Sequence, residues 1–235
     1  KVFIGSVALK VVSWTDTLIV GTLSKAIPPG IYDLVIQPKT GIETLREAYF
    51  TIRRPEIQSV VPSIGSAPDE VTLKGKYFGM KKGKVLLGDA PLKVLEWNDR
   101  QIRSLLNKAP KEGVYDIILQ RKEPKGAPPL TEPGGFTVRA PRIASIDPPG
   151  GSPGQSISIK GWFFGSKKGK VYLEYESKGY TRLKSCKVVT WFMDPLSGHG
   201  EVIFVVPSGL PSRAHALRLV NPAGEASASF TVLSP

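Results

Sequence analysis

Cysteine is almost absent from this chain of 235 residues, which has one, Cys186. No internal disulfide can form, so the chain either works in a reducing compartment or folds outside the cell on its apolar cores alone. The two histidines, His199 and His215, lie in different segments, without the thiol or carboxylate spacing of a metal site. Cys186 has no paired histidine motif, and we expect a buried apolar thiol. We therefore predict no catalytic residue, no cofactor and no metal.

Long apolar runs and helical patterns are also missing. No window approaches the length of a membrane span, and no amphipathic helical pattern exceeds a couple of turns. The 24 glycines and 21 prolines are typical of many short strands joined by tight turns. No secretory signal opens the sequence, but its first residues already look like the middle of a domain, so a leader could have been removed or left out.

What the chain does have is a repeat. The stretch VTLKGKYFGMKKGKVLLG (71–88) returns as ISIKGWFFGSKKGKVYL (157–173), with every shared residue displaced by 86 positions. A phosphate-binding loop would need four residues between its glycines, then Lys followed by Ser or Thr, and a helix. Gly79 and Gly83 enclose three residues, and Val85 begins a strand-like run. We interpret the stretch as two strands around a glycine-rich turn.

The repeat extends to the beginning of the chain. Residues 1–54 align with the second copy at an offset of 83, so that Lys1 corresponds to Lys84. We predict three domains, at 1–54, 55–140 and 141–235. The first lacks the equivalents of 55–83, which are the opening strands of the other two. Linkers are almost absent, and a proline stands at each junction, so we expect a rod with limited hinge freedom.

Each copy shows the same order of strand-like segments. After the glycine stretch comes a segment ending in tryptophan, at 9–14, 92–97 and 186–191, and then a polar turn that contains an aspartate. Further strands carry a tyrosine and a phenylalanine. We expect the tryptophans in the cores and the aspartates capping turns. About seven short strands per copy predict an all-β fold of tandem immunoglobulin-like β-sandwiches.

These elements resemble tandem IPT/TIG domains, the immunoglobulin-like family found in plexins, transcription factors and many bacterial surface proteins. The matching motifs are P-x-I with a following Pro and Gly, G-x-x-F-G-x-x-x-G-x-V, W-x-D-x-x-I, P-x-G-x-Y and a final F-x-V. The third copy departs, because Arg213-Ala214-His215 replaces P-x-G-x-Y. The resemblance implies the fold and leaves the function open, because one fold hosts many functions.

Charge suggests one group of candidate binding residues. The net charge of +12 is spread as +3, +4 and +5 over the three predicted domains, with Lys-rich turns in the glycine stretches. An even distribution favours general attraction to anionic surfaces over a single nucleic-acid groove. The candidate residues are Lys81, Lys82, Lys84, Lys167, Lys168 and Lys170. We favour the interpretation that they are solvated residues that keep strand edges from pairing.

Two other features are binding candidates. Trp162 replaces Lys76 beside the glycine stretch and could present an exposed ring to a sugar. The insertion KEPKGAPPLTEPGG (122–135), with Pro124, Pro128 and Pro129, lengthens a hairpin of the second domain. Loops on rigid scaffolds often carry binding sites, although an insertion can also be neutral.

The function predicted from these observations is a non-enzymatic, extracellular or cell-surface rod with a structural or adhesive role. One alternative is an accessory carbohydrate-binding region of a larger secreted enzyme, and another is a Rel-type DNA-binding protein. The predicted partner is a protein or a second copy, with an anionic polysaccharide as a further candidate. Nucleic acid fits least, because the basic residues are dispersed and rich in lysine.

The incomplete first domain allows three explanations. The opening strands could lie outside the residues considered, the chain could have been cut at this point, or another chain could supply the strands. In the third case, donated strands would join subunits head to tail into a filament.

Overall fold

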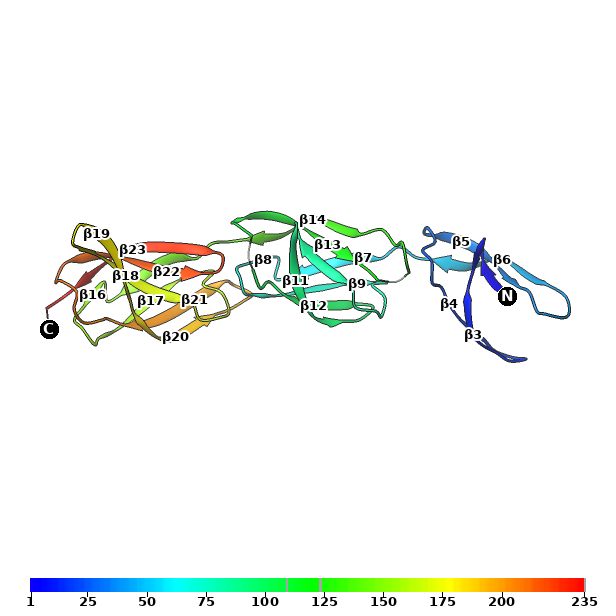
Figure 1. Cartoon of the computed structure of the whole chain (residues 1–235), viewed down its shortest axis with the longest axis horizontal. Coiled ribbons are helices and arrows are strands. Elements are labelled where there is room, and N and C mark those ends of the chain that lie inside the picture. The colour runs from blue at the N-terminus through cyan, green and yellow to red at the C-terminus, as the bar shows by residue number, and fades with distance from the viewer. Residues whose placement is uncertain (109, 123, 235) are drawn as a thin grey trace.

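The computed structural model describes all residues except 109, 123 and 235, and the described residues form twenty-three strands and no helix. The all-β prediction is confirmed. The strands lie in three groups that follow one another along the long axis, with the two termini at opposite ends (Figure 1). No helix in the described part of the chain is long and apolar enough to cross a membrane.

The middle group is a complete sandwich. Its strands are β7 (Glu56–Val61), β8 (Ile64–Gly65), β9 (Glu70–Lys76), β10 (Lys84–Leu87), β11 (Ala90–Trp97), β12 (Gln101–Leu105), β13 (Gly113–Gln120) and β14 (Leu130–Val138). They are ordered β7-β9-β12-β11-β10-β13-β14-β8. Strand β11 pairs with β10 through its first half and with β12 through its second half. It therefore belongs to both faces of the sandwich.

The third group has the same plan with the two faces separated. Its strands are β15 (Arg142–Asp147), β16 (Gly150–Gly151), β17 (Ser156–Trp162), β18 (Lys170–Ser177), β19 (Tyr180–Ser185), β20 (Lys187–Met193), β21 (His199–Val205), β22 (Ala214–Asn221) and β23 (Gly224–Val232). One sheet runs β15-β17-β21-β20 and the other β16-β23-β22-β18-β19. Cys186 lies between β19 and β20, so the segment that corresponds to β11 is divided into two strands here.

The first group contains only part of this plan. Its strands are β1 (Val2–Ile4), β2 (Val7–Ala8), β3 (Lys10–Trp14), β4 (Ile19–Thr22), β5 (Gly30–Ile36) and β6 (Thr44–Ile52). One sheet is ordered β2-β1-β5-β6, and β3 pairs only with β4 in a separate hairpin. In Figure 1 this hairpin extends away from the rest of the group.

Alternation of apolar and polar residues explains where the cores lie. In β9 and in β17, every second side chain is buried, as expected for strands with one face covered. The middle core includes Leu73, Ile102 and Phe136, and a separate core in the third group includes Ile159 and Phe230. Among the described residues of the first group, Val2 and Ile4 are the buried apolar ones.

Candidate functional site

The glycine stretch is a packing device. A β-carbon at Gly75 would lie 2.0 Å from the Glu56 carbonyl oxygen, and one at Gly83 would lie 2.1 Å from that of Gln120. Gly79 has φ +82°, where glycine is favoured because it has no Cβ. The indole Nε1 of Trp97 donates to the Gly79 carbonyl oxygen at 2.9 Å. The turn is therefore filled by the protein's own groups, as the sequence interpretation requires.

The third group repeats this arrangement. A β-carbon at Gly161 would lie 2.0 Å from the Arg142 carbonyl oxygen, and one at Gly169 would lie 2.3 Å from that of Val220. The indole of Trp191 donates to the Gly165 carbonyl oxygen at 2.9 Å.

The predicted turn cap is present at Asp194, whereas Asp99 bonds to the preceding glycine turn. The turn that contains Asp99 is capped by the Asn98 side-chain oxygen, which accepts from the amides of Arg100 at 2.9 Å and Gln101 at 2.8 Å. The Asp99 carboxylate accepts from the Gly79 amide at 2.8 Å, and that of Asp194 accepts from the Leu196 amide at 3.0 Å.

Two of the six candidate lysines bind the backbone. The ammonium of Lys82 donates to the Val94 carbonyl oxygen at 2.7 Å, and that of Lys168 donates to the Val188 carbonyl oxygen at 2.5 Å. Both carbonyls lie at a shift in strand register, where a residue drops out of the ladder pairing. These lysines satisfy carbonyls that the bulges release. Their role here is structural, and it was not foreseen because the bulges were not.

The other candidate lysines lie on the surface, in the two turns or at the first residue of the strand that follows. They are Lys81, Lys84, Lys167 and Lys170, and all are exposed. The turn of the third group contacts Asp69, just before β9, whereas the turn of the middle group follows the end of β9. The two sets of lysines therefore lie at opposite ends of the middle group.

Trp162 lies in β17 opposite His199 in β21. Its side chain is 36% exposed, and its ring meets the His199 imidazole edge to face with 5.3 Å between centroids. His199 is the first residue of β21. The indole is thus in contact with a side chain of the neighbouring strand.

Cys186 is buried, as predicted, and burial raises the pKa of its thiol to about 12. His215 is also buried, and its ring nitrogens lie 2.7 Å from the Glu174 carbonyl oxygen and 2.9 Å from that of Pro211. In the first two groups a tyrosine hydroxyl makes the latter contact. Tyr32 bonds to Pro28, and Tyr115 bonds to Lys111, four residues earlier in each case. His215 therefore substitutes for the tyrosine. Among the described residues, no group of three or more His, Cys, Asp or Glu could hold a metal ion.

The insertion connects the first and middle groups. Lys125 donates its amide to the Ser24 carbonyl oxygen and accepts from the Ala26 amide, both at 3.0 Å. These bonds form an isolated parallel bridge between Lys25 and Lys125. A cavity of about 790 Å³ lies beside the bridge, and it is lined by Pro124, Pro128 and Pro129. The structure thus brings the three predicted prolines together, but with residues from the first group that sequence reasoning missed.

The rest of the described lining of this cavity is mainly apolar and cationic. Pro28, Pro29, Tyr77 and several aliphatic residues contribute the apolar part, and the charged residues are Arg53, Arg54 and Arg121. The Nε of Arg121 is enclosed and has no hydrogen-bond partner among the described residues. Burial lowers the pKa of this guanidinium. The cavity is the candidate functional site.

The junction between the middle and third groups is packed more tightly. Asp69 is buried, and its carboxylate accepts from the amides of Ser66 at 2.8 Å and Ser166 at 3.1 Å. Desolvation by burial raises the pKa of this carboxyl, against the lowering effect of those bonds. The Asn221 side-chain amide donates to the Ser66 hydroxyl at 3.2 Å. Polar side chains of the middle group are therefore hydrogen-bonded to polar groups of the third group across the junction.

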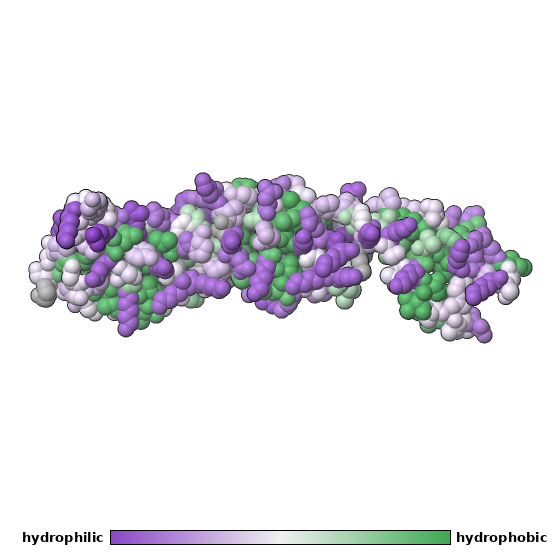
Figure 2. Space-filling model, in the orientation of Figure 1, coloured by the Kyte–Doolittle hydropathy of each residue, from purple (hydrophilic) through white to green (hydrophobic). Residues whose placement is uncertain are grey.

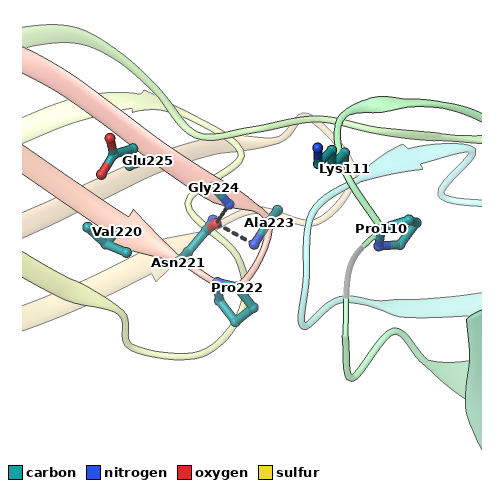
Figure 3. Close-up of a pocket in the computed structure, with 8 residues that line it drawn as sticks. All are labelled: Pro110, Lys111, Val220, Asn221, Pro222, Ala223, Gly224 and Glu225. Carbon is teal, nitrogen blue, oxygen red and sulfur yellow. Dashed lines mark hydrogen bonds between the residues drawn. The ribbon is translucent and has the colours of Figure 1, made fainter.

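A small hollow of about 330 Å³ lies at the edge of this junction, between the β22–β23 turn and a loop of the middle group (Figure 3). Asn221 shapes the turn, because its side-chain oxygen accepts from the amides of Ala223 at 2.9 Å and Gly224 at 3.1 Å. Ala223 packs against the middle core. The hollow lies between two packed surfaces, with the β22–β23 turn on one side and Pro110 and Lys111 on the other.

Comparison with known proteins bears on the family. The IPT/TIG domain family matches residues 55–136. No curated protein matches the chain. Among solved structures, the Plexin A4 extracellular region is 12% identical, with a TM-score of 0.46, over 77% of this chain and 18% of that one.

Two further solved structures are similar. A protein titled SGBP-B, from a xyloglucan utilization locus of Bacteroides uniformis, is 14% identical with a TM-score of 0.34, over 77% of this chain and 50% of that one. Gamma-CGTase from alkalophilic Bacillus clarkii is 17% identical with a TM-score of 0.32, over 70% and 23%. The chain spans less than a fifth of the plexin chain.

The family match and the glycine-turn geometry agree on the same residues. The turn, the buried Phe78 and the indole bond of Trp97 all lie within the matched range. The resemblance found in the sequence is confirmed there, and residues 55–136 of this chain are an IPT/TIG domain.

Proposed function

We propose that this chain is a non-enzymatic, stiff segment of an extracellular or cell-surface protein, with a structural or adhesive role. We take residues 1–54, 55–140 and 141–235 as three successive units of the rod. The observation that carries the proposal is the junction between the second and third units, where Asp69 and Asn221 pair polar groups across a buried contact. Joined sandwiches with paired buried contacts resist bending, whereas flexible linkers would leave the units free.

Other contacts at this junction act in the same direction. The Ser166 hydroxyl donates to the Pro68 carbonyl oxygen. Arg142 of the third unit lies 3.2 Å from the Glu112 carboxylate of the second, which also pairs with Arg139 at 3.0 Å. These hydrogen bonds lower the pKa of Glu112. Because the groups are exposed, the ion pairs guide orientation more than they contribute stability.

Small-angle X-ray scattering tests the stiffness. We expect one extended conformation to account for the scattering of the parent chain, and we expect Asn221→Ala combined with Asp69→Ala to broaden the distribution of dimensions. Asp16→Ala is the control, because Asp16 is an exposed residue of the first group and takes no part in this junction. A parent chain that already scatters like freely hinged units would overturn the proposal. So would turnover in an activity screen that a single substitution abolishes.

The adhesive partner belongs to the same proposal. A protein or a second copy remains the favoured partner, with an anionic polysaccharide as the alternative. Contact through the dispersed lysines should weaken steeply with salt, since exposed charges are screened beyond about 10 Å at 0.1 M. Binding that stays tight at high salt would favour a different surface.

A further inference from the structure

The cavity beside the insertion has the character of a small-molecule site. Its volume of about 790 Å³ falls within the range of roughly 300–1,000 Å³ that such sites occupy. It lies where two units meet, which is a common position for ligand sites. Its walls come from both sides of the junction and include the segment around Pro28, the linker around Arg54 and the insertion.

The walls are rigid as well as apolar. Proline fixes φ, so a wall rich in proline loses little conformational freedom when a ligand is bound. Pro28 and Pro29 come from the first unit, and Pro128 and Pro129 come from the insertion. The bridge of Lys125 with Ser24 and Ala26 ties these two segments together. The cavity is therefore formed before any ligand arrives.

The charged residues among the described lining of the cavity have one sign. Arg53, Arg54 and Arg121 line it, and none of the described lining residues is an aspartate or glutamate. The Nε of Arg121 is enclosed without a partner among the described residues. An enclosed donor without an acceptor is costly, and a bound anion would recover that cost with a charge-assisted hydrogen bond.

We propose that this cavity binds a small carboxylate with an apolar body, whose carboxylate pairs with Arg121 and whose body lies against the prolines and Tyr77. An acidic sugar fits less well, because a sugar needs many hydrogen bonds to its hydroxyls. Among the described lining residues, Thr51 and Tyr77 carry the side-chain hydroxyls. A guanidinium matches a carboxylate through two parallel N–H donors.

An occupant touching both sides would also hold the first junction together. A ligand that binds the closed junction and not the open one stabilises the closed form by mass action. The amides of Ala26 and Lys125 report on that closure because they form the bridge. Their exchange with solvent should slow when the cavity is filled.

Calorimetry with naphthylacetate, its neutral amide naphthylacetamide and galacturonate oligomers tests the proposal. We expect saturable binding of naphthylacetate, with the amide and the oligomers at least about tenfold weaker, which is the scale of one charge-assisted hydrogen bond. Hydrogen exchange in the presence of naphthylacetate should slow at Ala26 and Lys125. Equal binding of acid and amide, or preferred binding of galacturonate, would contradict the proposal.

Variants locate the site. Arg121→Met keeps the apolar stem, removes the charge and should weaken naphthylacetate binding at least about tenfold. Arg182→Met is the control, because Arg182 is an exposed arginine on β19 of the third unit. Ala127→Trp fills the cavity from the insertion and should abolish binding even if Arg121→Met does not fold. Unchanged binding in Ala127→Trp, or exchange slowed instead at β3 and β4, would place the acid elsewhere and overturn the proposal.

Discussion

The first and middle groups of strands have matching sequences and different surroundings. Phe50 pairs with Tyr32 across β5 and β6 as Phe136 pairs with Tyr115 across β13 and β14. Phe136 is 0% exposed, whereas Phe50 is 40% exposed. Trp14 is 40% exposed, whereas Trp97 is partly buried against the core. Aligned positions that form the core in the middle group thus lie on the surface in the first group.

The difference comes from strands β7 and β9. In the middle group, β9 pairs with β12 and brings Leu73 opposite Ile102, and the turn after β9 supplies the carbonyl that receives the Trp97 indole. The corresponding hairpin β3–β4 has no further strand among the described residues. Hydrophobic side chains accordingly reach the surface over this group (Figure 2). The expectation that all the tryptophans lie in cores is wrong for Trp14, because nothing in the described chain covers it.

Restoring the covering strands is the strongest test of this comparison. Residue Lys1 corresponds to Lys84, so a second copy of residues 55–83 fused directly before Lys1 should complete the first sandwich. Trp14 and Phe50 should become buried, and the first group should gain about 3 kcal/mol or more, since burying each large side chain contributes roughly 1.5–3 kcal/mol. Tryptophan fluorescence and hydrogen exchange of β4 measure the change.

The matched control is the same fusion with aspartate in place of the two buried residues of the added strand, the counterparts of Val71 and Leu73. That fusion should leave Trp14 exposed. If the unaltered fusion also leaves β4 unprotected, the missing strands are not the cause of the exposure.

Truncation of the equivalent tryptophans gives the next largest effect. Trp97→Ala should destabilise the middle group by about 3–5 kcal/mol, because it removes a large packed side chain and an indole hydrogen bond. Trp14→Ala should cost about 1 kcal/mol or less, because the indole is already exposed. Denaturant unfolding followed by hydrogen exchange within each group separates the two effects. Equal losses in both variants would show that Trp14 is covered in solution.

The sequence allowed much of this fold to be predicted. The spacing of Gly75, Gly79 and Gly83 indicated a strand–turn–strand element, and the structure shows which contacts exclude a side chain at each position. The order of strands followed from alternation and from the repeat. The bond from Lys82 to Val94 could not be predicted, because a bulge releases that carbonyl and strand register is not visible in residue types.

The candidate site was predicted only in part. The insertion stood out by its length and prolines, but its pairing with Ser24 and Ala26 depends on backbone amides, which every sequence has. Arg53 and Arg54 are neighbours in the chain, but they lie far from Arg121 and the insertion's prolines, so no local pattern connects the two parts of the lining. His215 illustrates the same limit, because its hydrogen bond replaces that of a tyrosine although the side chains differ.

The lysines of the glycine stretch give a smaller contrast. Lys82→Met should destabilise the middle group by about 1–2 kcal/mol, since it leaves the carbonyl of the Val94 bulge without its charged donor. Lys84→Met, two residues later at the start of β10, should stay within about 0.5 kcal/mol, because Lys84 is exposed. Thermal unfolding of both variants is the measurement. Equal shifts in unfolding temperature would show that Lys82 has no structural role.

Cys186 gives the smallest effect and a dependence on pH. It occupies the buried column of Leu92, and Cys186→Ala should cost about 1 kcal/mol at pH 8. Burial raises the pKa of its thiol from 9.0 to about 12, so the folded chain keeps a proton that the unfolded chain releases as the pH rises above 9. Because the unfolded chain is stabilised by ionising this thiol in that window, the folded state becomes less favourable. The free energy of unfolding of the unsubstituted chain should therefore fall between pH 9 and 12 faster than that of Cys186→Ala. The cost of the substitution, measured by urea unfolding, should therefore shrink across this range. A cost that stays constant, together with rapid labelling of the native thiol at pH 8, would show that Cys186 is solvated and that the third group opens at β19 and β20.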